Sequence, residues 1–221
     1  MTDAAKTDGI FNLTMPVVMS FPHLFEAKAY TPPGGKASGE PKFSANLNFP
    51  ADSEDLKGLK QLAAKIARAK WPDKQLSELH FPFSNGDKLA DDRKKKGRND
   101  GEYTRGKVVV NAKSKYEVRL AYIEKGKIID LETDTARLAA KGKFYSGVEV
   151  LAQLNLTPYE VSASNKGVTA YLNMVLSCGK GERLSGGQTA SDAFKGYVGS
   201  VSAEDPTAPG AGENLDDLMG M

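Results

Sequence analysis

Two segments alternate polar and apolar residues with a period of two. Residues 42–49 set phenylalanine, alanine and leucine on one face against lysine, serine and asparagine, and residues 107–113 set valine and alanine against lysine and asparagine. This period is typical of strands with one buried face. We expect another strand to begin at Met15, and further strands, rich in Val, Leu and Tyr, at 116–122, 144–156 and 169–177. Their connections are too irregular for a parallel sheet with alternating helices, so the pattern favours an α+β or all-β barrel.

One helix is expected early in the chain, after Pro50. Asp52 or Ser53 is placed to cap it, acidic residues occupy its first turn and basic residues its last. Its apolar stripe is formed by Leu56, Leu59, Leu62, Ala63 and Ile66. The pair Trp71-Pro72 ends it, because the residue before a proline is pushed out of helical geometry. Residues 131–141 are a candidate for a second, short helix.

The net charge of +2 conceals a strong asymmetry. Residues 203–221 contain five acidic residues and no Lys or Arg, whereas residues 93–119 contain ten Lys and Arg against three acidic residues. The polar stretch 83–105, with turn signals at Asn85-Gly86 and 99–101, is predicted to be a long, mobile basic loop. A basic body with an acidic tail favours a polyanionic partner, which the tail replaces on the same surface when that partner is absent. The alternative is that both are merely solvated faces.

Aromatic residues are interleaved with the basic ones. Single-stranded nucleic acid needs this combination, because Lys and Arg follow the phosphates while flat rings stack on bases without reading sequence. Tyr103 and Tyr116 are the better stacking candidates, while Tyr122 and Phe144 fit a core role equally well. The predicted nucleic-acid-binding residues are Arg93, Lys94, Lys95, Lys96, Arg98, Tyr103, Arg105, Lys107, Lys113, Lys115, Tyr116 and Arg119.

Other classes of function lack the residues they require. The only cysteine, Cys178, and the two histidines, His23 and His80, are too few for a disulfide or most zinc sites, so neither metal nor cofactor is expected. The stretch 101–108 resembles a phosphate-binding loop but has Val108 where a magnesium-binding Ser or Thr is needed. No apolar run is long enough to cross a bilayer, and the first residues lack the pattern of a leader. We therefore expect a cytoplasmic, non-enzymatic protein.

Five segments in order resemble a family of tailed-phage single-stranded DNA-binding proteins. They are residues 21–26 (FPHLFE), 40–47 (EPKFSANL), 106–115 (GKVVVNAKSK), 145–150 (YSGVEV) and 166–173 (KGVTAYLN). The resemblance covers roughly residues 15–195. It implies a mainly β (α+β) fold: a five-stranded OB-fold barrel with an inserted helix, a long basic loop and a disordered acidic tail. The implied division is a flexible N-terminus (1–14), an OB-fold single-stranded DNA-binding domain (15–195) and a flexible acidic C-terminal tail (196–221).

The resemblance also implies partners. The acidic tail is expected to recruit replication or recombination proteins and to compete with DNA, through Glu213, Asp216, Asp217, Leu218 and Met219. A homodimer with tails reaching across is a further implication, and the host-cell cytoplasm is the implied location.

The resulting hypothesis is a non-enzymatic protein that coats and protects single-stranded DNA, without sequence specificity, in phage replication or recombination. Three alternatives stay open at this stage: an annealing or recombination mediator that also binds double-stranded DNA, a virion or scaffold component, and an enzyme such as a nuclease. Strand preference, site size, polarity, RNA binding and oligomeric state are not fixed by the sequence.

Overall fold

The computed structural model describes residues 9–30, 38–97 and 101–184. By their contacts the residues form two units, 1–185 and 186–221, and the second lies wholly outside the described residues. The predicted acidic tail, residues 196–221, therefore lies outside the described residues. Arg98 also lies outside them, in the gap between residues 97 and 101. No helix in the described part of the chain is long and apolar enough to cross a membrane.

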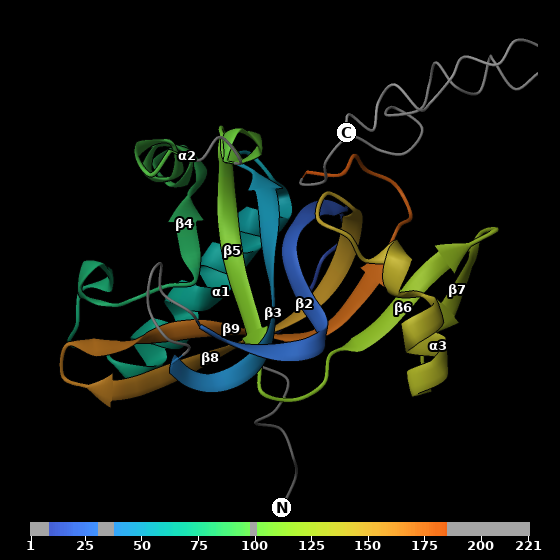
Figure 1. Ribbon diagram of the computed structural model, residues 1–221. Helices are drawn as coiled ribbons and strands as arrows, with labels where there is room; N and C mark the ends of the chain where they lie inside the picture. Colours follow the sequence, from blue (N-terminus) through green and yellow to red (C-terminus); the bar gives the residue numbers. More distant parts are fainter. Residues whose placement is uncertain (1–8, 31–37, 98–100, 185–221) are drawn as a thin grey trace, which may run out of the picture. The chain divides into compact units, whose positions relative to one another are not determined.

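Five strands close into a barrel (Figure 1). They are β2 (Val17–Tyr30), β3 (Ser38–Pro50), β5 (Lys107–Ser114), β8 (Glu149–Ser162) and β9 (Asn165–Ser177). Around the barrel the order is β8-β2-β3-β5-β9, and β9 closes the ring by pairing with β8. Every pairing in the ring is antiparallel except β5 with β9. This closed ring of five strands confirms the predicted OB-fold barrel.

Four short strands extend the barrel: β1 (Ile10–Asn12), β4 (Phe83–Asn85), β6 (Arg119–Glu124) and β7 (Lys127–Asp130). β1 pairs with β8 and β4 with β5, while β6 lies beside the second half of β9 and β7 pairs with β6. The predicted flexible N-terminus is therefore wrong for residues 10–14. β1 is held by its ladder, and Asp55 accepts hydrogen bonds from the Thr14 amide (2.9 Å) and hydroxyl (2.8 Å).

The helices are α1 (Glu54–Lys70), α2 (Gly86–Lys95) and α3 (Asp134–Ala139), with one-turn helices η1 (Leu76–Glu78), η2 (Glu102–Thr104) and η3 (Lys141–Lys143). The predicted early helix is α1, inserted between the second and third barrel strands. Ser53 caps it by accepting a hydrogen bond from the Leu56 amide, and Trp71 ends it. Its apolar side is buried against the barrel core. The expected short helix is α3.

The stretch 83–105 is not one long loop, and that prediction is corrected. It contains β4, α2 and η2. A short segment between α2 and η2 includes residues 98–100, which lie outside the described part. Asn85, taken as a turn residue, caps α2 by accepting a hydrogen bond from the Lys88 amide at 3.0 Å. Thr104 ties η2 to the start of α2, because its buried hydroxyl donates to the Gly86 carbonyl at 2.7 Å. The many charges of α2 hide its short buried side, which is little more than Gly86 and Ala90.

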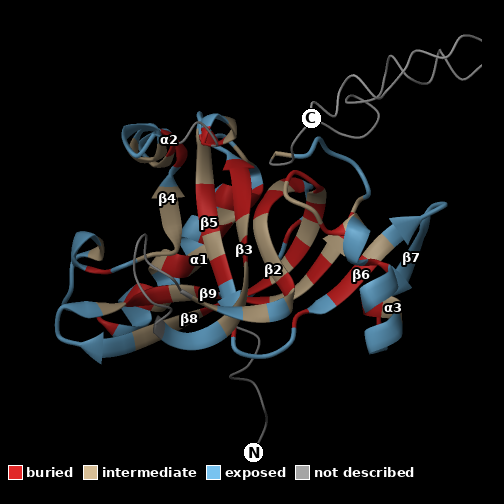
Figure 2. Cartoon of the chain, in the orientation of Figure 1, coloured by how far each residue is buried: buried red, intermediate tan, exposed pale blue. Residues whose placement is uncertain are grey.

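The core fills the barrel, where the inward faces of the strands are buried (Figure 2). Along β3 the predicted inward residues Ala45, Leu47 and Phe49 are at 1% exposure or less. Asn48, predicted to face outward, is also buried at 1% exposure, because its side-chain amide donates to the Val18 carbonyl and the Ser20 hydroxyl. Phe144, which fitted either a stacking or a core role, is 5% exposed and belongs to the core. The outward faces of β3 and β5 are left to build a surface.

Candidate nucleic-acid interface

The outward faces of β3 and β5 form a polar floor. Ser44 lies directly opposite Lys113 in the ladder, and Asn46 lies opposite Asn111. The Asn111 side-chain amide donates to the Asn46 side-chain oxygen at 2.6 Å, which fixes both side chains on the floor. The fold thus supplies a flat surface of amides, hydroxyls and ammonium groups.

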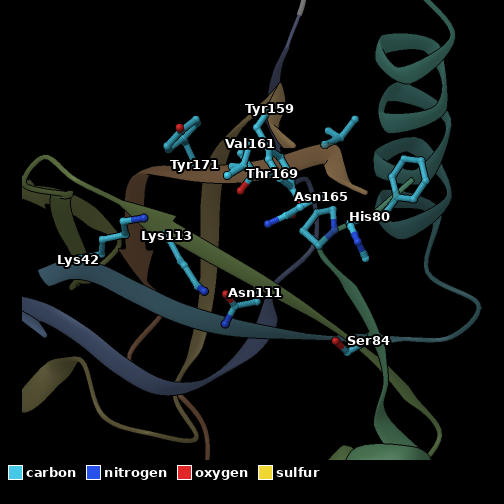
Figure 3. Close-up of a pocket in the computed structure, with 13 residues that line it drawn as sticks. Lys42, His80, Ser84, Asn111, Lys113, Tyr159, Val161, Asn165, Thr169 and Tyr171 are labelled. Carbon is cyan, nitrogen blue, oxygen red and sulfur yellow. The ribbon is translucent and has the colours of Figure 1, made fainter. Parts of the chain in front are cut away.

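One half of the floor is walled by the β8–β9 ribbon (Figure 3). The resulting cavity of about 640 Å³ is lined by Tyr159, Thr169 and Tyr171 from the ribbon, with Lys42 and Lys113 from the floor. Lys113 is the direct neighbour of Tyr171 where β5 runs parallel to β9. Tyr171 is 37% exposed, so its ring is accessible beside an ammonium group. This pairing brings a cation and an aromatic ring together on one surface.

The same half is closed by residues 80–82. His80 forms a bridge with Gly167: the His80 amide donates to the Lys166 carbonyl (3.0 Å), and the His80 carbonyl accepts from the Val168 amide (2.9 Å). A Cβ on Gly167 would lie 2.0 Å from the His80 carbonyl oxygen. Only glycine at 167 therefore allows the segment to approach β9 and form this wall.

Replacing Gly167 with alanine is expected to destabilise the protein by about 1–3 kcal/mol, because backbone atoms cannot yield as a flexible side chain does. Denaturant unfolding measures the loss. Gly142→Ala is the matched control, since its Cβ would meet nothing within 4 Å, and we expect a change below about 0.5 kcal/mol. Equal stabilities for the two variants would contradict the tight contact.

The other half of the floor lies between β2 and α2. This cavity of about 820 Å³ is lined by Phe21, His23 and Lys28 from β2 and by Leu89 and Arg93 from α2. The Arg93 guanidinium lies over the Phe21 ring, 4.6 Å from its centroid. Phe21 has a φ of 49°, a conformation that is strained for a phenylalanine, at an irregularity in the β2–β3 ladder.

The two cavities share Lys42, Ser84, Asn111 and Lys113 and so form one groove, here called the β3–β5 groove. Lys28 and Lys42 are directly opposite each other across β2 and β3. Neither has an ion-pair partner among the described residues. Like charges in that position repel each other, and a bound phosphate would relieve the repulsion.

Other groups in the groove adjust its charge. Burial lowers the pKa of His23, and nearby Lys28 lowers it further, so His23 is neutral at pH 7 and the positive potential comes from lysine and arginine. Glu40 lines the groove and forms an ion pair with Lys115 at 2.6 Å. This pair lowers the pKa of Glu40 and raises that of Lys115.

The structure brings only part of the predicted set into this groove. Arg93 and Lys113 line it, and Lys115 reaches it through Glu40. Lys107 lies on β5 opposite Pro50, at the other end of the strand from Lys113. Lys94, Lys95 and Lys96 are exposed at the end of α2.

Four predicted residues lie elsewhere. Arg105 is paired with Asp91 (2.9 Å) and Glu102 (2.7 Å), which compensate its charge and tie η2 to α2. Tyr103 has a buried hydroxyl with no hydrogen-bond partner among the described residues. Tyr116 is 82% exposed but does not line the groove. Arg119 lines a separate cavity together with four carboxylates.

The sequence reasoning missed Lys28, Lys42, Tyr159 and Tyr171 as site residues. The sequence contained a signal for Lys42, because the period of two along the strand places its side chain on the outward face, away from that of its neighbour Phe43. Tyr171 lies in the segment 166–173 and alternates with the buried Ala170 and Leu172. That parity marks both as outward, but it does not say which outward faces become neighbours.

Comparison with known proteins identifies a family and solved structures that are similar to this chain. Residues 12–206 match the family model described as Enterobacter phage Enc34, ssDNA-binding protein. No curated protein sequence matches the chain.

Solved structures of the bacteriophage Enc34 single-stranded DNA-binding protein are similar in fold. Its complex with single-stranded DNA has a TM-score of 0.61 at 22% identity, covering 81% of this chain and 91% of that one. Another structure of the same Enc34 protein has a TM-score of 0.58 at 20% identity, covering 85% of this chain and 91% of that one. A C-terminal truncation of it has a TM-score of 0.59 at 21% identity, covering 80% and 90%.

Proposed function

We propose that this chain, which belongs to the Enterobacter phage Enc34 single-stranded DNA-binding protein family, binds single-stranded DNA along the β3–β5 groove. The observation that carries the proposal is the Lys113–Tyr171 neighbour pair, continued by the opposed Lys28 and Lys42. Ammonium groups along a strand face neutralise phosphates, and accessible rings beside them stack on bases. The complex of the similar bacteriophage Enc34 protein with single-stranded DNA supports the same ligand.

The proposed role is binding rather than catalysis. The groove offers contacts that suit any sequence, because stacking and phosphate neutralisation do not distinguish one base from another. Such a protein coats and protects single-stranded DNA during phage replication or recombination, in the cytoplasm of the host cell. The acidic tail is proposed to recruit replication or recombination proteins and to compete with DNA for the cationic groove.

A single experiment tests this function. Fluorescence anisotropy compares labelled single-stranded and double-stranded oligonucleotides, at low and moderate salt, with the full chain and with a chain ending at Ser202. We expect preferential binding of single strands, with an affinity that falls steeply as salt rises. Tighter binding by the shorter chain would support the competing tail. Equal affinity for both DNA forms would favour the annealing mediator, and no binding by either chain would overturn the proposal.

A further inference from the structure

The outer end of the β8–β9 ribbon, residues 158–168, extends beyond the barrel. The pairings of β8 with β1 and β2, and of β9 with β5 and β6, all involve residues outside this range. Within it, among the described residues, the two strands pair only with each other, apart from the bridge between His80 and Gly167. A two-stranded ribbon is marginally stable by itself. The position of this ribbon end therefore depends on what supports it from its sides.

Tyr159, one of the two tyrosines in the groove, stands on the ribbon end (Figure 3). It lies opposite Gly167 in the ladder, and glycine offers no side chain to steady the ring. Val161 lines the same cavity. Because successive side chains of a strand point to opposite faces, Glu160 points away from the groove. The place of the Tyr159 ring consequently follows the place of the ribbon backbone.

The opposite face of the ribbon end is held by the end of α1. Trp71, which ends that helix and is 9% exposed, donates a hydrogen bond from Nε1 to Glu160 Oε2 at 3.3 Å. Glu160 Oε1 lies 3.7 Å from the Nζ of Lys166, its direct neighbour across the ladder. One carboxylate thus links both strands of the ribbon to a core residue of the barrel. Neither Trp71 nor Glu160 is among the described residues that line the groove.

We propose that Trp71 and Glu160 are positioning residues for single-stranded DNA. Their hydrogen bond holds the ribbon end from behind, at the place where the Tyr159 ring can stack on a base. The inference rests on the proposed function, because it concerns how the same groove keeps its shape. Support of this kind matters, since a binding group displaced by about 1 Å loses much of its contribution.

Glu160→Ala tests the proposal, because charge and position predict opposite results for it. Removing the carboxylate makes the protein more positive, which by itself would tighten binding to DNA. Loss of the support should instead weaken binding about fivefold, through the displaced ring. The Glu160 side chain is 47% exposed, so its removal leaves no cavity in the core. Anisotropy with labelled single-stranded DNA at moderate salt measures the change.

Glu124→Ala is the matched control. The Glu124 side chain is 50% exposed, pairs with Lys143 at 3.2 Å and lies on β6, outside the groove. The control changes the net charge by the same amount and removes a similar ion pair. It should therefore bind single-stranded DNA as tightly as the wild type, or slightly more tightly.

Three further measurements separate positioning from a merely structural role. Glu160→Gln keeps an acceptor oxygen for Trp71 and should restore affinity close to that of the wild type. Trp71→Phe removes the donor and should weaken binding, but adding it to Glu160→Ala should weaken binding little further, because both changes remove the same contact. In a Tyr159→Ala background, Glu160→Ala should change affinity by less than about twofold, because the ring that it positions is gone.

Unchanged or tighter binding by Glu160→Ala, no rescue by Glu160→Gln, or an undiminished loss in the Tyr159→Ala background would each overturn the proposal. Absence of DNA binding by the wild type would overturn the proposed function and this inference with it. A wild type that binds, beside a Glu160→Ala variant that binds equally well, would overturn the inference alone.

Discussion

Replacing Tyr159 and Tyr171 together with alanine is expected to weaken single-stranded DNA binding by about 30-fold or more. Each ring that stacks on a base contributes about 1–3 kcal/mol, and every 1.4 kcal/mol is a factor of ten. Both rings line the same half of the β3–β5 groove and come from adjacent strands of one ribbon. Anisotropy titration at fixed salt measures the loss. The dependence of affinity on salt should stay as in the wild type, because no phosphate contact is removed.

Tyr116→Ala is the matched control for this prediction. Tyr116 is a more exposed tyrosine, it lies next to Lys115, and the sequence favours it for stacking, yet it does not line the groove. We expect its removal to leave affinity within a factor of about two. If Tyr116→Ala cost more affinity than the double variant, the aromatic platform would lie outside the groove.

The barrel was predictable because its signals are local. The period of two along β3 and β5 correctly separates inward Leu47 and Val110 from outward Ser44 and Asn111. The cap and apolar stripe of α1 are likewise readable within one helix length. Several short elements escaped prediction: β1, β4 and β7 are too brief to show a period, and the charges of α2 conceal its small buried side.

The groove was harder to predict because it depends on long-range pairing. Lys113 and Tyr171 become neighbours only through the parallel register of β5 with β9, across 58 positions of sequence. Counting charges also treats all cations alike. Arg105 adds to the basic segment in the sequence, but the fold pairs it with Asp91 and Glu102, and no short-range pattern reveals the first of these partners.

The second large effect on DNA affinity is expected from the row of lysines in the β3–β5 groove. Replacing Lys28, Lys42 and Lys113 with alanine is expected to lower affinity for single-stranded DNA at least about tenfold at moderate salt. Each phosphate contact with a single strand contributes about 0.7 to the slope of log affinity against log salt. Losing three contacts should therefore reduce that slope by about 2. A titration series from low to moderate salt measures both quantities.

The control removes the same number of cations from another surface. Lys60, Lys65 and Arg68 lie on the exposed side of α1, border one shallow depression and have no ion-pair partner among the described residues. Replacing these three with alanine changes the net charge equally, so a general attraction of the protein for DNA would weaken by a similar amount in both triple variants. Binding in the β3–β5 groove instead predicts that the α1 variant keeps nearly the full slope. An equal loss of slope in the two variants would show that total charge, rather than this row of lysines, attracts the phosphates.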